Sequence, residues 1–262
     1  QPLTAVRAKP AVPFGLNRLI DFPFGNLALS RADHICLVTQ EKSDSLLAHV
    51  DETWQAMFTA PGKLRSLTKR PASKGKTEEG WYFHTAAAVT DNVDLVGKID
   101  PTIVHVFPAD HVFYMDVNQM NTFHKARDAD LTISATPVPL EVAANTYGVL
   151  EVDRQGRVLN FQEKPSNPAP MPGRPEFCLA SMGIYAFKPE VLVEVLAEDA
   201  SKKSTRDKRL LAKLSTKKTG ETRFKGKYQE PGGKDYKELV FTINQPGKRG
   251  MPAIYKKSRL DK

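Results

Sequence analysis

Short apolar runs alternate along this chain with segments whose apolar residues recur at helical spacing, and this alternation limits the fold more than any other feature. Residues 34–40 (HICLVTQ) and 102–107 (TIVHVF) have the length and composition of buried strands. Between them, the segment 43–58 carries an apolar stripe at helical spacing, formed by Leu46, Leu47, Val50, Trp54, Met57 and Phe58. Strands that alternate with helices in this way predict an α/β fold with a mostly parallel sheet and helices on both faces.

The rest of the first half continues this alternation. Periodicity is lost over residues 59–80, which are rich in Lys, Arg, Ser and Gly and predict a mobile surface loop. After this loop we expect a helix over 85–96, a helix over 116–127 and a strand over 130–138. In the helix over 116–127, Asp116 is expected to be the N-cap, with Met120 and Phe123 turned inward.

The second half departs from simple alternation. Residues 147–164 predict a β-hairpin, because YGVLEVD and VLNFQEKP are joined by a turn at RQGR, and such hairpins often lie beside a parallel sheet as a lid. SMGIYAFK (181–188) predicts a further strand, and Pro189 suits the first turn of a following helix. ELVFTI (238–243) is the one convincing strand after residue 200.

Charge divides the chain into two parts. Residues 1–200 contain 19 Lys and Arg against 24 Asp and Glu, whereas residues 201–262 contain 19 against 6 and have a net charge of +13. We expect one domain over 1–200 and a basic, poorly patterned tail over 201–262. Such a tail is either a solvated extension, which is the commoner case, or a segment that binds nucleic acid or another polyanion. It lacks the interleaved aromatic residues of single-strand binders, so we do not expect a nucleic-acid partner.

The cysteines and the apolar runs argue against several classes of protein. Cys36 and Cys178 are too few for a disulfide framework, and each lies in an apolar run, so we expect two reduced, buried thiols in a cytoplasmic protein. No apolar stretch approaches the ~18 to 20 residues of a membrane span. The N-terminal QPLTAVRAKP has no signal-peptide core. We therefore expect neither a secreted disulfide protein nor a membrane protein.

Asp110 is the first candidate for chemistry. It follows the predicted strand TIVHVF, and ligands of open parallel sheets bind beyond the carboxyl ends of the strands. A carboxylate at that place can hold Mg²⁺ against phosphate oxygens. The next side chain, His111, should point to the opposite side of an extended chain. On local grounds alone, a functional and a structural role for Asp110 are equally open.

Two other segments carry cations that could hold a phosphate. Arg7 and Lys9 lie in RAKPAVPFG, whose prolines stiffen the loop, so they could clamp a phosphate or form surface ion pairs. Glu163 and Lys164 come at the end of the predicted hairpin and precede a proline-rich loop. A carboxylate beside an ammonium suits a sugar phosphate, and an ordinary surface ion pair is the equal alternative.

Three further positions offer hydrogen-bonding groups. Ser181 and the backbone near Gly183 could bind a ligand or simply pack within a strand. Tyr82 and Thr85 stand at a predicted helix start, where backbone amides can face an anion or a base. For an isolated segment, Thr85 as an ordinary N-cap is the commoner outcome.

Taken together, these segments resemble bacterial glucose-1-phosphate adenylyltransferase, also called ADP-glucose pyrophosphorylase. The resemblance spans roughly residues 2–200 in order and spacing, and rests on RAKPAVPFG, RLIDFP with Asn26, WY with Thr85 and Ala86, ADHVFYMD, YGVLEVD, FQEKPSNPAPMPG and LASMGIY. Several of these motifs distinguish this branch from other sugar nucleotidyltransferases. The resemblance implies a Rossmann-like nucleotidyltransferase catalytic domain that uses Mg²⁺, ATP and α-D-glucose 1-phosphate to make ADP-glucose for glycogen or starch synthesis.

The resemblance also implies roles on the nucleotide side of the site. It assigns Asp110 to the catalytic metal, and Lys9, with Arg7 in the same motif, to the nucleotide phosphates. Tyr82 would lie near the adenine, with Thr85 in the same segment. The implied reaction is an in-line attack by a glucose 1-phosphate oxygen on the α-phosphorus of ATP, which expels pyrophosphate.

On the sugar side, the resemblance assigns Glu163 to a glucose hydroxyl, Lys164 to the sugar phosphate and Ser181 to the glucose ring. Gly148 would allow the backbone to approach the sugar closely. The family also implies a homo-oligomer, a tetramer in its known members.

Some features of the family are not found in this sequence. The glycine-rich loop GG-x-G-T-R-L stands immediately before PLT in the family, and this chain begins at Gln1; the C-terminal β-helix is also not found. No WRDVGT-type motif follows residue 200, and Asp235 is a weak substitute for its metal-binding aspartate. Two functions therefore stay open: an adenylyltransferase with impaired turnover, and a catalytically silent nucleotide-sugar-binding or regulatory subunit.

Overall fold

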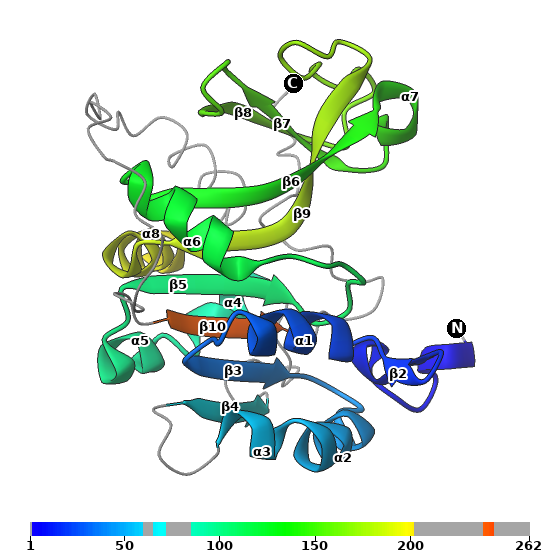
Figure 1. The fold of residues 1–262 in the computed structure, drawn as a ribbon, viewed down its shortest axis with the longest axis vertical. Coiled ribbons are helices and arrows are strands. Elements are labelled where there is room, and N and C mark those ends of the chain that lie inside the picture. The colour runs from blue at the N-terminus through cyan, green and yellow to red at the C-terminus, as the bar shows by residue number, and fades with distance from the viewer. Residues whose placement is uncertain (1, 60–64, 72–84, 202–237, 244–262) are drawn as a thin grey trace.

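The computed structural model describes residues 2–59, 65–71, 85–201 and 238–243, and its main element is an eight-stranded sheet (Figure 1). The strands run in the order β4-β3-β10-β5-β9-β7-β8, and β6 pairs with β9 outside this row. They are β3 (His34–Thr39), β4 (Ser66–Pro71), β5 (Ile103–Pro108), β6 (Leu131–Pro139), β7 (Gly148–Val152), β8 (Val158–Glu163), β9 (Phe177–Phe187) and β10 (Glu238–Ile243). A separate small hairpin precedes them, formed by β1 (Pro13–Phe14) and β2 (Asn17–Arg18).

Helices cover both faces of the sheet, as the alternation of strands and helices predicts. They are α1 (Asp21–Leu29), α2 (Asp44–Thr53), α3 (Gln55–Phe58), α4 (Thr85–Thr90), α5 (Asp94–Ile99), α6 (Val117–Ala126), α7 (Leu140–Ala143) and α8 (Pro189–Ser201), with 3-10 turns η1 (Pro2–Thr4) and η2 (Lys9–Ala11). One core lies between the sheet and α4, α5 and α8, and a second between the sheet and α1, α2, α3, α6 and η2. The fold class is therefore α/β, with a mostly parallel central sheet between two layers of helices.

A strand from the last part of the chain lies in the middle of the parallel part of the sheet. β10 pairs in parallel with both β3 and β5, so that Phe241 lies opposite Cys36 on one side and Val106 on the other. Successive residues of β10 enter opposite cores, Phe241 the first and Val240 the second. Residues 238–243 were expected to form a strand, which is confirmed, and this piece of the predicted basic tail lies in the centre of the sheet.

The predicted strand over 130–138 is present as β6, but its partner differs from the expectation. A continued parallel sheet would place it beside β5, whereas β6 pairs antiparallel with β9, and β9 pairs antiparallel with β5. β9 thus separates two strands that run in the same direction. Local periodicity predicts that a strand exists but carries no information about its neighbour.

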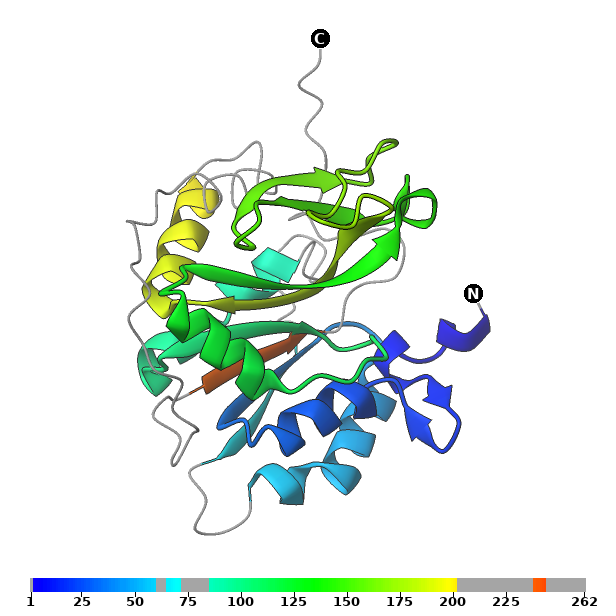
Figure 2. The ribbon, with the colours of Figure 1, turned by 45° about the horizontal axis from the view of Figure 1, so that its top comes forward.

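β9 is long because it belongs to two parts of the sheet (Figures 1 and 2). Its last residues pair with β5, and Leu179 and Ala180 near its start pair with β7 of the hairpin. Between these parts, Tyr185 pairs with Ile133 and Ser181 with Ala135, which leaves residues 182–184 opposite Ser134 alone. Gly183 has a φ of 70°, a conformation that glycine adopts readily. The irregularity bends β9 and carries the hairpin away from the main sheet.

Several other predicted elements are confirmed. The hairpin forms from β7 and β8 with antiparallel pairing, and Pro189 begins α8. Asp116 is the N-cap of α6, because its side chain accepts a hydrogen bond from Asn118 N at 2.9 Å. Both cysteines are free and buried, and burial raises the pKa of Cys36 to about 12. Within the described ranges, no helix has the length and apolar character needed to cross a membrane.

Five local expectations are corrected. The predicted loop over 59–80 contains the strand β4, a short strand with several polar residues that pairs with β3, while 60–64 and 72–84 lie outside the described residues. The single helices expected over 43–58 and 85–96 are each divided in two. Phe123 and Met57 were expected to face inward but are 45% and 49% exposed. Each lies at the margin of its apolar stripe, where periodicity places a side chain least well.

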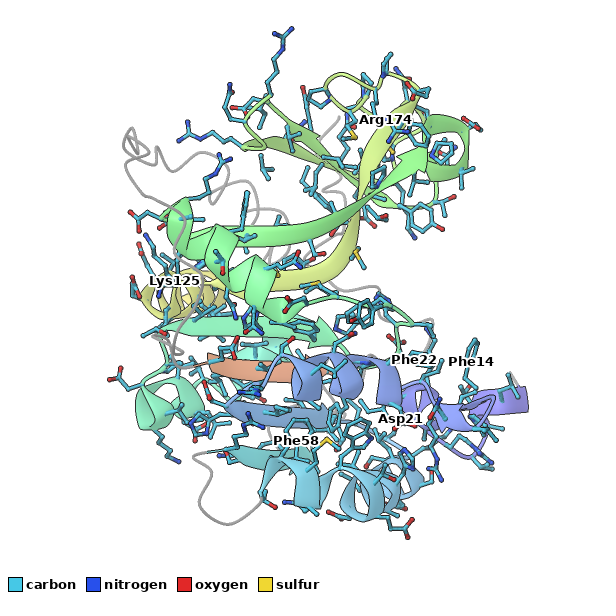
Figure 3. The ribbon with its side chains drawn as sticks, in the orientation of Figure 1. Phe14, Asp21, Phe22, Phe58, Lys125 and Arg174 are labelled. Carbon is cyan, nitrogen blue, oxygen red and sulfur yellow. The ribbon has the colours of Figure 1, made fainter. Side chains whose placement is uncertain are left out.

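α1 is held against its neighbours by a buried carboxylate and a group of aromatic rings (Figure 3). Asp21 accepts hydrogen bonds from Arg18 N at 2.6 Å and from Trp54 Nε1 at 2.7 Å, and His49 Nε2 lies 2.7 Å from the same carboxylate. Burial alone would raise the pKa of Asp21, but these hydrogen bonds hold it below its ordinary value. Phe24 adds an edge-to-face contact with Phe58, with ring centroids 5.8 Å apart.

A fully buried polar group ties β10 to α6 and β5. Asn121 Nδ2 donates to Glu238 Oε1, and Asn121 Oδ1 lies 2.7 Å from His105 Nε2. His105 Nε2 is also 3.7 Å from Glu238 Oε1, and both side chains have no solvent exposure. On the other side, Glu238 N donates to Asp33 Oδ2 at 3.0 Å. The first residue of β10 is therefore tied by polar groups to three other segments.

We predict that Asn121→Ala destabilises the fold by about 3 kcal/mol, because the buried Glu238 loses one of its donors and His105 loses its partner. Chemical denaturation followed by circular dichroism measures this change. Gln119→Ala, at an exposed position of the same helix, is the matched control and should change the free energy of unfolding by less than about 0.5 kcal/mol. Equal stability of the two variants would show that the buried polar group does not hold β10.

Candidate functional site

Four segments meet at the carboxyl edge of the parallel strands (Figure 1). Ala8 N donates to Lys42 O at 2.9 Å, which joins the N-terminal loop to the loop after β3. Ala109 N donates to Ile243 O at 3.1 Å, which joins the end of β5 to the end of β10. Ligands of open parallel sheets bind at this edge, so the residues around these two hydrogen bonds form the candidate site.

Lys9 and Asp110 are brought together at this edge. Lys9 Nζ lies 2.8 Å from Asp110 Oδ2, although the two residues are far apart in the sequence. The Asp110 side chain is 5% exposed, whereas that of Lys9 is 55% exposed. The ion pair thus joins a fixed, buried carboxylate to a cation that reaches it from solvent. Each residue was a sequence candidate, but nothing in the sequence predicts their contact.

The second oxygen of Asp110 is available for a cation. Asp110 Oδ1 is buried and has no hydrogen-bond partner among the described residues, and His111 Nε2 is 3.8 Å from it. His111 was expected to point away from Asp110; the chain turns at residues 109–110 instead of staying extended, so the alternation of side chains does not apply. A buried carboxylate oxygen that lacks a donor is a suitable ligand for a hard cation.

The residues present fit a magnesium ion that is shared with a phosphate. Mg²⁺ is usually held by one or two protein carboxylates together with waters and substrate phosphates, and Asp110 supplies one. In the described part of the chain, no group of three or more His, Cys, Asp or Glu side chains could form a complete metal cage. Asp235, the weak substitute for a second carboxylate, lies outside the described residues.

A second group of candidates lies on the hairpin. Glu163, the last residue of β8, pairs with Gly148, the first residue of β7. Glu163 is half-buried, and this burial raises its pKa to about 7, although the ammonium of Lys164 lowers it in part. Lys164 has a φ of 44°, and its N–H donates to Tyr147 O at 3.1 Å. A carboxyl group that titrates near neutral pH beside a lysine is suited to bind hydroxyl and phosphate groups.

Gly148 has a packing role that the sequence did not reveal. A Cβ on Gly148 would lie 2.5 Å from Cζ of Phe161, a contact too short for real atoms. The Phe161 ring therefore fills the space that a side chain at 148 would need. A role for Gly148 in close approach to a sugar stays a prediction beside this packing role.

The bend of β9 connects the hairpin to the Asp110 edge. Ser181 Oγ accepts a hydrogen bond from Gly183 N at 3.2 Å, which closes the bend on itself. A Cβ on Gly183 would lie 4.0 Å from His111 Cε1, so the bend runs next to the residue that follows Asp110. Ser181 is thus placed between the two groups of candidates.

The remaining candidates are less fully described. Arg7 is half-buried in the bend between η1 and η2, two residues before Lys9. Thr85 is the first residue of α4, and its side chain lies outside the described part. Tyr82 also lies outside the described residues. The structure therefore joins Lys9 to Asp110 and Glu163 to Gly148, and leaves the predicted adenine contact untested.

In the sequence, Asn26 is part of a family motif without an assigned role and Ser30 is not singled out, whereas the structure shows that both hold the loop after Asp110. Asn26, on α1, is hydrogen-bonded to Phe113 and Met115 of that loop, and Ser30 to Val117. The sequence contains one signal for such a role, because Asn26 stands between apolar residues on the buried side of the helix DFPFGNLAL. A polar side chain at a core position generally has a specific partner.

Comparison with known proteins identifies the family. The family model described as nucleotidyl transferase matches residues 1–231. The chain belongs to the nucleotidyl transferase family. This membership agrees with the α/β fold and with the position of the Lys9–Asp110 pair at the carboxyl edge of the sheet.

Individual relatives within the family carry one name. Proteins named glucose-1-phosphate adenylyltransferase from Methylococcus capsulatus and Thermus thermophilus are 42% and 44% identical over 201 and 203 residues, or 76% of this chain. One from Vibrio parahaemolyticus is 40% identical over 211 residues, or 78% of this chain. The matches cover 46%, 48% and 50% of these relatives, so the nucleotidyl transferase chain spans about half their length.

We predict that Gly148→Ala destabilises the protein by about 1–3 kcal/mol, because the added methyl group overlaps the Phe161 ring. Urea denaturation measures the loss. Gly97→Ala is the control, since a Cβ at position 97 of α5 meets nothing within 4 Å and alanine favours a helix. In a double-mutant cycle, Phe161→Leu should recover part of the loss; an additive result would contradict the proposed contact.

Proposed function

We propose that this nucleotidyl transferase chain is the catalytic domain of a glucose-1-phosphate adenylyltransferase. It would transfer the adenylyl group of ATP to α-D-glucose 1-phosphate, releasing pyrophosphate and giving ADP-glucose for glycogen or starch synthesis. The names of relatives that are 40–44% identical to the chain support this substrate pair. The sequence motifs on the hairpin and on β9 support the sugar-phosphate half of the proposal.

The observation that carries the proposal is the Lys9–Asp110 pair, in which Asp110 Oδ1 has no hydrogen-bond partner among the described residues. Asp110 is buried, and a buried carboxylate is costly unless a cation accompanies it. In the ligand-free protein Lys9 supplies that cation. Asp110 Oδ1 would hold Mg²⁺, which would supply positive charge against the phosphates when bound.

Lys9 can then serve the nucleotide. Its side chain is exposed enough to turn from Asp110 Oδ2 to a phosphate oxygen. Arg7, from the same loop, adds a second cation to the phosphates. Both cations would stabilise the charge that grows on the departing pyrophosphate, and no covalent intermediate is needed.

The hairpin and the bend of β9 would hold the acceptor. Glu163 would accept a hydrogen bond from a glucose hydroxyl, Lys164 would pair with the sugar phosphate, and Ser181 would contact the ring. Because Gly183 at the bend lies beside His111, the acceptor would be presented toward the Asp110 edge. Positioning of this kind accounts for most of the catalysis in phosphoryl-transfer enzymes.

The first test is pyrophosphate release from ATP, Mg²⁺ and glucose 1-phosphate. Asp110→Asn keeps the shape of the side chain but removes its charge, and we predict that it lowers turnover by about 10²-fold or more. Asp116→Asn is the matched control: asparagine caps a helix as well as aspartate does, so turnover should stay within about twofold. Equal turnover in all three proteins would remove Asp110 from the site. Binding of glucose 1-phosphate without turnover would instead favour a nucleotide-sugar-binding or regulatory subunit.

The second test uses the raised pKa of Glu163. Because this pKa is about 7, the carboxyl group ionises between pH 6 and pH 8, and the ionised form accepts the stronger hydrogen bond. We predict that the affinity for glucose 1-phosphate, measured by calorimetry, rises by about fivefold over this interval. The Glu163→Gln variant should show only the titration of the ligand phosphate. Parallel pH profiles would exclude contact between Glu163 and the sugar.

The raised pKa of Glu163 also affects the stability of the fold, which changes with pH in the opposite direction to the affinity for glucose 1-phosphate. A carboxyl group whose folded pKa is raised stabilises the fold below its ordinary value of 4.5, and this contribution is lost as the pH rises through about 7. Without ligand, Glu163→Gln should therefore gain stability relative to the parent protein as the pH rises from about 4.5 to above 7. Thermal unfolding at a series of pH values separates this effect from sugar binding.

A further inference from the structure

The loop that follows Asp110 is held by hydrogen bonds from a neighbouring helix. Asn26, on α1, is 2% exposed, and its side-chain amide both donates and accepts a hydrogen bond. Its Nδ2 donates to Phe113 O at 3.0 Å, and its Oδ1 accepts from Met115 N at 3.1 Å. These backbone groups lie on residues two positions apart, as they do where a parallel strand pairs with its neighbour. The Asn26 side chain thus takes the place of a neighbouring peptide group.

Ser30, one helical turn later, extends this attachment. It is 3% exposed, and its Oγ accepts a hydrogen bond from Val117 N at 3.0 Å. Residues 111–116 have no regular secondary structure, so these side chains provide pairing that a ladder would otherwise give. α1 is itself held in place through Asp21 and Phe24 at its first turn. The loop is therefore attached to a rigid support.

Asp110 lies between two points at which the chain is anchored by hydrogen bonds. On one side, Ala109 N is bonded to Ile243 O at the end of β10. On the other, Phe113 and Met115 are bonded to Asn26. The short stretch between these anchors contains Asp110 and His111. In this stretch Asp110 is buried, whereas Val112 is 49% exposed and so adds little packing that could hold the chain in place.

We propose that Asn26 is a positioning residue for Asp110: it sets the path of the chain after the carboxylate and so the direction in which Asp110 Oδ1 faces. Asn26 itself does not touch substrate. The inference rests on the proposed function for the metal-holding role of Asp110. Residues that orient a metal-binding carboxylate typically change metal affinity or activity by 10- to 100-fold when altered.

The test variant is Asn26→Asp, which keeps the shape of the side chain but replaces the Nδ2 donor by an acceptor that faces Phe113 O. Mn²⁺ serves as the probe, because it suits the same oxygen ligands as Mg²⁺ and its free concentration is read by electron paramagnetic resonance. We expect Asn26→Asp to weaken Mn²⁺ binding by about tenfold, and to lower kcat for pyrophosphate release while the KM for glucose 1-phosphate stays within about threefold. Ser30→Ala removes one bond of the same attachment, is less disruptive to folding, and should give a smaller loss in the same direction.

Two further variants separate failure of the positioning role from failure of the proposed function. Leu27→Val, in the same helix but in the second core, lowers stability while both hydrogen bonds of Asn26 remain, and should leave Mn²⁺ affinity and kcat unchanged. Asp110→Asn should abolish Mn²⁺ binding. If it does, and Asn26→Asp and Ser30→Ala bind Mn²⁺ as the parent does, the positioning role is wrong and the proposed function stands. If Asp110→Asn binds Mn²⁺ as the parent does, or the parent does not bind it, the metal role of Asp110 and the positioning role both fail.

Discussion

The parallel pairing of β10 with both β3 and β5 is the interaction on which the rest of the structure depends. In the described part of the sheet, β3 and β5 are joined only through β10, and side chains of β10 enter both cores. The strand begins at Glu238, whose N–H bonds to a residue 205 positions away, and ends at Ile243, whose carbonyl accepts from the residue before Asp110. The same strand therefore connects the buried polar group at one edge of the sheet to the candidate site at the other.

The bend of β9 divides the candidate site into two halves and joins them. The proposed nucleotide half would lie at the ends of parallel strands, where loops from different parts of the chain meet. The proposed acceptor half would lie on the hairpin, which the start of β9 carries away from the main sheet. Gly183 lies at the bend, where a Cβ would be 4.0 Å from His111 Cε1, so the bend runs beside the Asp110 edge. In the proposed reaction this arrangement would help to orient two bound substrates, and orientation supplies much of the rate.

Charge compensation explains why the site is stable without ligands. Asp110 is buried and accepts an ion pair on one oxygen, and the partner is the exposed, movable Lys9 rather than a buried lysine. The cost of desolvation thus falls mainly on Asp110, and in the proposed function the exposed Lys9 would remain available to phosphates. On the hairpin the balance is different, because Glu163 is half-buried and its raised pKa allows it to lose its charge near neutral pH.

By itself, the sequence determined the local elements and the chemical types of the site. Periodicity predicted β3, β5, the β7–β8 hairpin, α8 and the Asp116 cap, because each depends on residues close together in the chain. It failed for β4, whose polar, partly exposed residues carry a weak strand signal, and it could not tell that β6 lies beside β9. It named Lys9, Asp110, Glu163 and Lys164 as candidates, but not which of them meet. Only the tertiary structure decided the central place of β10, the Lys9–Asp110 contact and the hydrogen bonds from Asn26 to the loop that follows Asp110. The physical reason is that each of these joins segments far apart in the chain, and such pairing is set by the burial of a whole sheet rather than by any local pattern.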